Sequence, residues 1–168
     1  MLLCLIMAIK IFALISAYLS MELIAWSMHK YIMHGFLWSL HKTHHQKGKA
    51  FFEKNDWYFV FFAVLGSSFM LRGGMDGYTW LFYMGVGITL YGFTYLIVHD
   101  IIIHQRVRLL SKLNSPYINA LRRAHRAHHA NTGKEGGVSF GMLWVDTRYY
   151  SHPNQSSRAS VLSNNQNA

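Results

Sequence analysis

Three long apolar stretches constrain the fold of this 168-residue chain more than any other feature. They lie at residues 11–28, 57–71 and 78–98. A membrane-spanning helix needs about 17 to 25 predominantly apolar residues. The third stretch meets this length directly, and the first meets it once residues 1–9 extend it past Lys10. The second needs Asn55, Asp56 and Arg72 at the membrane interface. We therefore predict an all-α integral membrane bundle with three to four membrane helices.

The composition supports a membrane protein. Apolar residues make up 52% of the chain and charged residues only 14%, so a soluble bundle would have little polar surface to cover three such helices. A cleaved signal peptide fits poorly, because no charged residue precedes Lys10 and the first apolar stretch passes directly into a histidine pair. The single cysteine, Cys4, excludes an intramolecular disulfide and a cysteine-based metal site.

The chain divides into one predicted domain, residues 1–150, and a polar tail, residues 151–168. The tail is rich in Ser, Asn and Gln, a composition that predicts disorder. His152 lies in this tail, so we interpret it as solvated and not as a ligand.

Ten of the eleven histidines form a pattern that occurs twice. Each copy reads H-x4-H followed by H-x2-H-H. Histidine is the commonest metal-ligating side chain, and a duplicated five-histidine pattern predicts two metal ions in an imidazole-rich site, with one half-site from each repeat. The candidate ligands are His29, His34, His41, His44, His45, His99, His104, His125, His128 and His129.

The two spacings have different consequences on a helix. In H-x2-H-H, the second and third histidines lie about 60° and 40° to either side of the first, so all three can face one site. In H-x4-H, the two histidines lie about 140° apart on a straight α-helix. Either the helix ends or bulges between them, or they serve different ions. Gly35, directly after His34, is consistent with a helix end.

The order of stretches and histidines predicts a topology. Two crossings separate the two histidine groups, joined by the turn-rich segment 72–77. An even number of crossings returns the chain to the same side, so both groups should lie on one face. Most Lys and Arg residues lie near the histidines, which places that face in the cytoplasm and the N-terminus outside. The same distribution argues against nucleic acid as a partner despite the net charge of +9. We thus expect a multi-pass protein of the cytoplasmic membrane with a cytoplasmic, histidine-rich di-metal cap.

The ligand types bear on the metal. The chain has seven acidic residues and none stands in a Glu-x-x-His motif, so nitrogen ligands dominate. A closed zinc site needs about four ligands and a catalytic one about three. Ten imidazoles suit two ions of higher coordination number, and a redox role favours iron.

Two carboxylates are candidates for orienting the ligands. Glu22 lies seven residues before His29, on the same helical face, and Asp100 is adjacent to His99. Each is either an acceptor for a ligating imidazole or a structural group: Glu22 as an internal partner for a lysine or the backbone, Asp100 as a partner of Arg106.

Aromatic residues flank the histidines. They either line a path from the bilayer to the metals or anchor the helices at the membrane interface. These residues are Trp26, Phe36, Trp38, Phe93 and Tyr95. The basic segments 42–54 and 122–126 likewise either dock an acidic electron-transfer protein or contact anionic lipids.

Five phrases carry a resemblance to a known family. They are HKYIMHG (29–35), HKTHH (41–45), HD-x3-HQR (99–106), HRAHHA (125–130) and GKEGGVSFG (133–141). They resemble the membrane fatty-acid-hydroxylase and desaturase superfamily and, within it, the bacterial β-carotene 3-hydroxylases, over about residues 20–143. The resemblance implies two non-haem iron ions, O2 as co-substrate, a ferredoxin-type electron donor and a carotenoid substrate taken from the bilayer. The reaction would be hydroxylation of C3 of β-ionone rings, from β-carotene through β-cryptoxanthin to zeaxanthin.

Other functions remain open at this point. A carotenoid 4-ketolase or a sterol or fatty-acyl hydroxylase would share the histidine boxes. A b-type haem electron carrier or a zinc or nickel transporter would place ligands within the membrane helices, whereas these histidines lie at or beyond the ends of the apolar stretches. A noncatalytic metal buffer would not need duplicated spacing.

Overall fold

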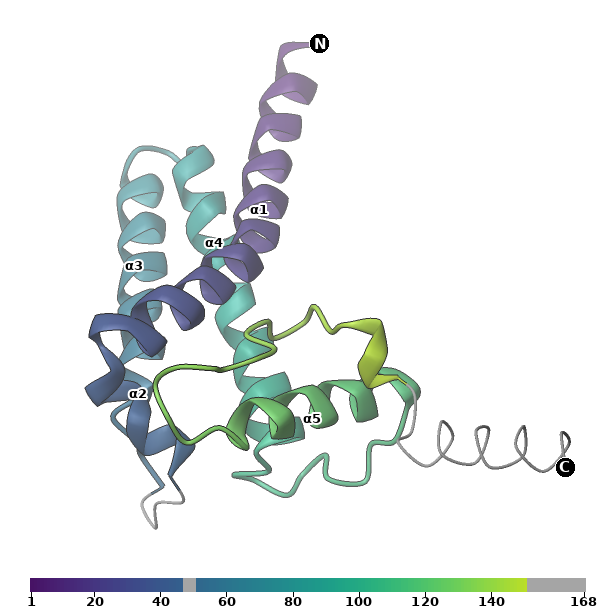
Figure 1. Ribbon diagram of the computed structural model, residues 1–168. Helices are drawn as coiled ribbons and strands as arrows, with labels where there is room; N and C mark the ends of the chain where they lie inside the picture. Colours follow the sequence, from purple (N-terminus) through teal and green to yellow (C-terminus); the bar gives the residue numbers. More distant parts are fainter. Residues whose placement is uncertain (47–50, 151–168) are drawn as a thin grey trace, which may run out of the picture.

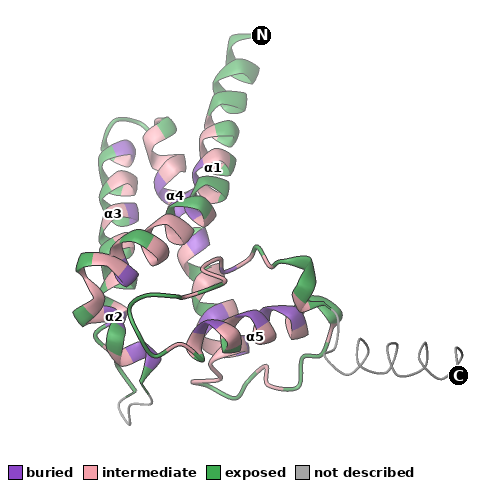
Figure 2. Cartoon of the chain, in the orientation of Figure 1, coloured by how far each residue is buried: buried purple, intermediate pink, exposed green. Residues whose placement is uncertain are grey.

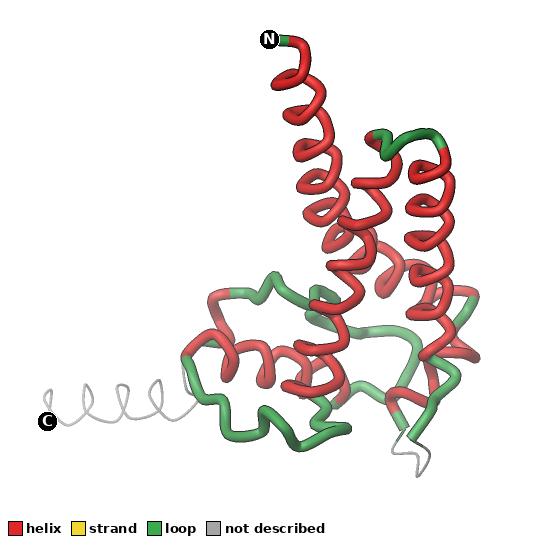
Figure 3. Tube along the Cα trace, turned by 180° about the vertical axis from the view of Figure 1, so that it is seen from behind, coloured by secondary structure: helices red, strands yellow, loops and turns green. Residues whose placement is uncertain are grey.

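The computed structural model describes residues 1–46 and 51–150, in which all the regular secondary structure is helical and no strand is present (Figure 3). The predicted tail and His152 lie outside these residues. Three helical segments are long and apolar enough to cross a membrane: Leu2–Phe36, Asp56–Met75 and Trp80–Ile103. The predicted all-α membrane fold is confirmed.

The first spanning segment changes its helical pitch near its end. Helix α1 (Leu2–Ser27) continues directly into the π-helical segment η1 (Met28–Phe36). Gly35 then leaves the helical region, at φ −104° and ψ −125°, and the short helix α2 (Trp38–His45) follows. The break at Gly35 agrees with the predicted helix end.

The second and third spanning segments form an antiparallel hairpin. Helix α3 (Asp56–Met75) is followed by α4 (Trp80–Tyr95), which continues into the π-helical segment η2 (Leu96–Ile103). The reversal begins later than the predicted 72–77 segment, because α3 runs on through Gly73. A Cβ at Gly73 would lie 2.2 Å from the backbone nitrogen of Phe82, so glycine lets the two helices touch up to the turn.

Helix α4 is the centre of the bundle and packs against both α1 and α3 (Figure 1). Gly85 meets α3, where a Cβ would lie 2.7 Å from the Met70 nitrogen, and Gly87 meets α1, where it would lie 2.4 Å from the Leu14 carbonyl oxygen. Glycine at these two positions thus lets α4 approach both of its neighbours closely. Gly92 has only an ordinary contact, 3.8 Å from Phe59.

Helix α5 (Pro116–His129) lies across the end of the bundle (Figure 1). It begins sharply because Pro116 occupies the first turn and the Ser115 hydroxyl accepts a hydrogen bond from the Ile118 N–H at 3.2 Å. The chain then returns over the bundle through residues 130–146, which we call the strap. A single 3-10 turn, η3 (Thr147–Tyr149), follows.

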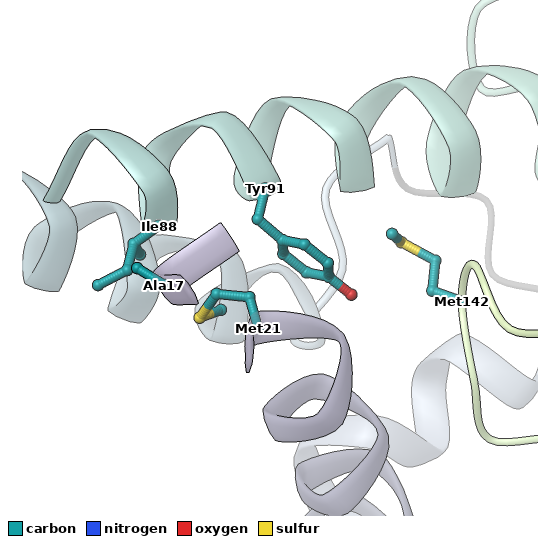
Figure 4. Close-up of a cluster of buried hydrophobic side chains, with 5 residues drawn as sticks. All are labelled: Ala17, Met21, Ile88, Tyr91 and Met142. Atoms are coloured by element: carbon teal, nitrogen blue, oxygen red, sulfur yellow. The ribbon is translucent and has the colours of Figure 1, made fainter. Parts of the chain in front are cut away.

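Burial in this protein is inverted relative to a soluble bundle (Figure 2). Only 6% of the most apolar window of the first span is buried, so its hydrophobic side chains face outward, as lipid requires. A small apolar core joins α1, α4 and the strap (Figure 4): Ala17, Met21, Ile88, Tyr91 and Met142. Among the described residues, every buried polar residue except Asn55 is a histidine. The interior of the helical cap is therefore made of imidazoles.

Candidate metal centre

The ten predicted ligands all lie at one end of the bundle, on η1, α2, α5 and the η2 segment with its C-cap. Nine of them form two groups whose side-chain nitrogens lie within 4.8 Å of one another. The first group is His29, His34, His41, His45 and His128; the second group is His44, His99, His104 and His125. Both repeats meet on one face, as the even number of crossings predicted.

The π-helical pitch explains the H-x4-H spacing. Residues five apart would diverge on an α-helix, but the wider turn, closed by hydrogen bonds to the fifth preceding residue, places them on one face. The His104 N–H donates to the His99 carbonyl oxygen in this way, at 2.8 Å. The imidazole centroids of His29 and His34 are 5.4 Å apart, and those of His99 and His104 are 4.5 Å apart. Of the alternatives left open by the spacing, the helix bulge is the one the structure contains.

The two groups do not follow the two repeats completely. The middle histidine of each H-x2-H-H motif points into the opposite group, so His128 joins the first group and His44 the second. The prediction of one half-site from each repeat was therefore incomplete. Each group contains one imidazole from the other half of the chain.

His129 stands outside both groups but matches a member of the first. It occupies the position in its repeat that His45 occupies in the other, and its ring lies 4.4 Å from His125 and 4.7 Å from His44, between centroids. Among the described residues, its Nε2 is the one buried side-chain N or O atom without a hydrogen-bond partner. An unpaired buried nitrogen is costly, and its position identifies His129 as a fifth candidate ligand for the second group.

The strap orients most of the first group. Four Nδ1 atoms donate to strap carbonyl oxygens: His29 to Phe140 at 3.0 Å, His34 to Lys134 at 2.9 Å, His45 to Asn131 at 2.9 Å, and His128 to Val138 at 2.7 Å. The fifth, His41, pairs with Asn55 Oδ1 at 2.7 Å. A carbonyl oxygen only accepts, so each bonded Nδ1 carries the proton and each Nε2 presents a lone pair inward.

This arrangement fits a cation at the centre of the first group. The Nε2 atoms of His34 and His128 both present lone pairs, yet they lie 3.3 Å apart, and the Nε2 atoms of His29 and His41 are 3.1 Å apart. Such a contact is repulsive unless a positive charge lies between the nitrogens. Metal–nitrogen bonds of about 2.1 Å would separate ligands at right angles by roughly 3.0 Å. The donor set thus has the spacing of a coordination shell.

The second group has charged partners. His44 Nδ1 lies 2.9 Å from Glu53 Oε2, and His99 Nδ1 lies 2.8 Å from Asp100 Oδ1. Arg106 links the carboxylates, at 3.4 Å from Glu53, 3.0 Å from Asp56 and 3.8 Å from Asp100. Asp100 therefore fills both roles foreseen for it, as acceptor for an imidazole and as partner of Arg106.

Glu22 does not fill the role of an imidazole acceptor. Its carboxylate accepts hydrogen bonds from the Tyr91 hydroxyl at 2.7 Å and from the backbone N–H groups of Met142, Leu143 and Trp144 at 3.0, 2.8 and 3.0 Å. The alternative, an internal partner for the backbone, is the one present. Both Glu22 and His29 form hydrogen bonds with the strap and not with each other.

Several residues of the centre were not found from the sequence. Asn55, expected at the membrane interface, is 5% exposed and pairs with His41. Glu53 was not singled out, because it lies between the apolar stretches, where no predicted helix gives it a register. The strap carbonyls carry no residue signature at all, because every residue has one.

Burial favours the neutral form of the imidazoles that lie outside the spanning segments. Loss of solvation lowers the pKa of His41, His128 and His129 to about 3 and that of His104 to about 2. The same cause, opposed by Arg106, raises the pKa of Glu53. Neutral imidazoles are the form that binds a metal ion, so the ligands are ready at neutral pH.

An apolar pocket ends on both groups. It is lined by residues of all three spanning segments, encloses about 1020 Å³ of space including open solvent at its mouth, and reaches His29 and His41 of the first group and His99 and His125 of the second. Of the flanking aromatics, Tyr95 lines it and stacks on His99, with centroids 4.5 Å apart. Trp38 packs instead on His34 and His45, while Phe36 and Phe93 are exposed. Of these five aromatic residues, Tyr95 alone lines the pocket.

Comparison with known proteins gives the class first. The family model described as fatty acid hydroxylase matches residues 14–148, and the chain belongs to this family. It is a membrane hydroxylase with a histidine cluster that can bind metal.

Several relatives of the chain are β-carotene hydroxylases. The chain is 46% identical over 127 residues to the β-carotene hydroxylase of Pantoea ananas, covering 76% of this chain and 72% of that protein. It is 41% identical over 134 residues to that of Paracoccus sp. (strain PC1), covering 78% and 81%. A chloroplastic β-carotene 3-hydroxylase of Arabidopsis thaliana is 35% identical over 134 residues, covering 77% and 43%. No significant match to a solved structure was found.

Proposed function

We propose that this protein hydroxylates C3 of the β-ionone rings of a carotenoid, converting β-carotene through β-cryptoxanthin to zeaxanthin. The observation that carries the proposal is the apolar pocket that is lined by residues of the three spanning segments and ends on both histidine groups. A hydrocarbon ring partitioned into the bilayer can enter it without crossing water. The bacterial relatives named for the same substrate support this choice.

Two iron ions are the proposed cofactors. The first would be held by the five histidines of the first group, and the second by the four of the second group together with His129. When bound, the ions supply the oxidising power that O2-dependent insertion of oxygen into a C–H bond requires. Imidazole suits iron among the redox metals.

The chain's own residues position the substrate and exclude water. Met21, Phe62, Leu121 and Met142 line the pocket with apolar surface, which holds the ring by dispersion and hydrophobic contact. Tyr95, stacked on His99, closes the wall beside the second group. Holding C3 next to the reactive end of the pocket contributes orientation, and the dry walls suppress side reactions.

The electron donor is proposed to be an acidic, ferredoxin-type protein that approaches the histidine end from the cytoplasm. Lys42, Lys54 and Arg126 are exposed there and suit such a partner. Arg122 and Arg123 do not, because both donate to backbone carbonyl groups of this chain, including those of Ile102 and Tyr149.

A haem carrier is disfavoured by the same geometry. Haem needs two imidazoles facing each other across an apolar slot, whereas here the nitrogens of each group converge within 4.8 Å. A carotenoid 4-ketolase would share the centre and the pocket, so the product must distinguish it.

The test is product analysis in a bacterial host that accumulates β-carotene. We expect β-cryptoxanthin and zeaxanthin to appear with the wild-type chain and to be absent with His128→Ala, which should still be found in the membrane fraction by immunoblot. A keto product, or unchanged β-carotene, would reject the assignment.

A further inference from the structure

Glu22 is an ionisable group inside the first apolar span, and it is held by four hydrogen bonds. Three come from the consecutive N–H groups of Met142, Leu143 and Trp144 to Oε1, and one comes from the Tyr91 hydroxyl to Oε2. Three successive N–H groups converging on one oxygen form an anion-binding nest. A carboxylate within a membrane segment is costly unless paired, and the hydrogen bonds from the strap and Tyr91 supply that pairing.

The strap that Glu22 holds is the element that orients the first histidine group. Its carbonyl oxygens accept from four of the five first-group histidines, and the nearest of these acceptors, Phe140, lies two residues before Met142. Phe140, Met142 and Trp144 also line the apolar pocket. Figure 4 shows Met142 of the strap facing the Tyr91 ring of α4.

The second group is oriented by other means. His44 and His99 pair with Glu53 and Asp100, which lie before α3 and within η2. Among the described residues, no hydrogen bond between the strap and a second-group histidine is present. A further hydrogen bond holds the C-terminal part of the strap, because the Tyr117 hydroxyl donates to the Leu143 carbonyl oxygen at 2.7 Å.

We propose that Glu22 is a positioning residue that latches the strap over the first histidine group, so that retention of the first ion depends on Glu22 and retention of the second does not. The inference rests on the two-ion centre proposed above. Loss of groups that orient metal ligands typically costs about 10- to 100-fold in affinity. The expected effect is therefore selective for one ion.

The test is the metal content of full-length protein, purified in detergent after anaerobic loading with ferrous iron. We expect about two ions per wild-type chain and about one per Glu22→Ala chain. Asp76→Asn is the matched control, because it also removes a carboxylate next to a spanning helix. Asp76 follows α3 at the opposite end of the bundle, where it pairs with Arg72. This variant should retain both ions.

Double variants identify the ion that is lost. Adding Glu22→Ala to His34→Ala, in the first group, should remove no further metal. Adding it to His125→Ala, in the second group, should bring the content close to zero. This pattern of coupling is what two residues serving one site produce.

Glu22→Gln guards against a failure of Glu22→Ala to fold. The amide keeps an oxygen for the three N–H groups but loses the charge, and we expect one of its two ions to exchange with a chelator about tenfold faster than in the wild type. Retention of both ions at wild-type exchange rates in both variants, or equal loss of both ions, would overturn the latch. A wild-type chain that does not bind about two ions would instead refute the proposed centre itself.

Discussion

At the scale of single residues, the two histidine groups differ in what holds their Nδ1 atoms. Carbonyl and amide oxygens do so in the first group, whereas in the second group the carboxylates of Glu53 and Asp100 hold the Nδ1 atoms of His44 and His99. An imidazole bonded to a carboxylate donates its lone pair to a metal ion more strongly than an imidazole bonded to a neutral carbonyl group. Two ions bound here would therefore sit in unlike electrostatic surroundings.

His129 provides the first prediction at this scale. We expect His129→Ala to lower hydroxylation at least about 100-fold, since even groups one step beyond the ligands are worth about 10- to 100-fold. The measurement is zeaxanthin formed per unit of membrane protein. His152→Ala, a histidine in the polar tail that we do not predict to be a ligand, is the matched control and should leave the yield unchanged. Equal activity of the two variants would remove His129 from the centre.

At the scale of elements, the π-helical segments η1 and η2 show how far the sequence alone could lead. The spacing of His29 and His34 indicated that a straight α-helix could not serve both residues, and Gly35 indicated a break. The spacing could not distinguish a helix bulge from ligation of separate ions, because the outcome depends on packing against α5 and the strap. The exchange of His44 and His128 could not be foreseen for the same reason: it is a relation between two helices, not a property of either.

The packing of α1 against α4 gives a prediction about stability. A Cβ at Gly87 would lie 2.4 Å from the Leu14 carbonyl oxygen, and overpacking of this kind costs about 1–3 kcal/mol. We expect Gly87→Ala to lower the midpoint of thermal unfolding in detergent, followed by circular dichroism.

Gly92→Ala is its control, because a Cβ there meets only Phe59 at 3.8 Å while the gain in helix propensity is the same. If both variants unfold at the same temperature, the contact is not as close as the structure has it.

At the scale of the whole molecule, apolar side chains face outward and imidazoles fill the interior of the cap. The three spans and the shared face of the histidines were predictable, because they follow from hydropathy and from the parity of crossings. The boundary between membrane and cap was not: Asn55, polar and next to a span, lies inside the cap with His41. A backbone acceptor such as the Val138 carbonyl oxygen cannot be predicted from the sequence, because only the fold brings it close to His128.

The buried imidazoles make the metal-free protein sensitive to acid. The pKa of His41, His128 and His129 is about 3 in the folded state, against roughly 6.5 when unfolded. Between these values the unfolded chain binds more protons, so the free energy of unfolding falls as the pH drops below about 6.5.

We expect chelator-treated protein to melt at a lower temperature at pH 5.5 than at pH 7.5. A melting temperature that stays constant or rises on acidification would contradict the buried, neutral state of these side chains.

The proposed orientation can be tested by labelling. In a Cys4→Ser background, Asp76→Cys lies in the turn between α3 and α4 and should react with a membrane-impermeant maleimide in intact cells. Lys54→Cys, exposed at the histidine end, should react only after the membrane is opened. The reverse pattern would place the histidines outside.

The exchange of the middle histidines has a consequence for how the centre assembles. His44 completes the group built mainly by η2 and α5, and His128 completes the group built by η1 and α2. Neither half of the nascent chain contains a whole coordination set, and the last contribution comes from residues near the C-terminal end of α5. Either complete group can therefore assemble only after α5 has packed against η1 and α2, so neither half of the chain can form a full coordination set by itself.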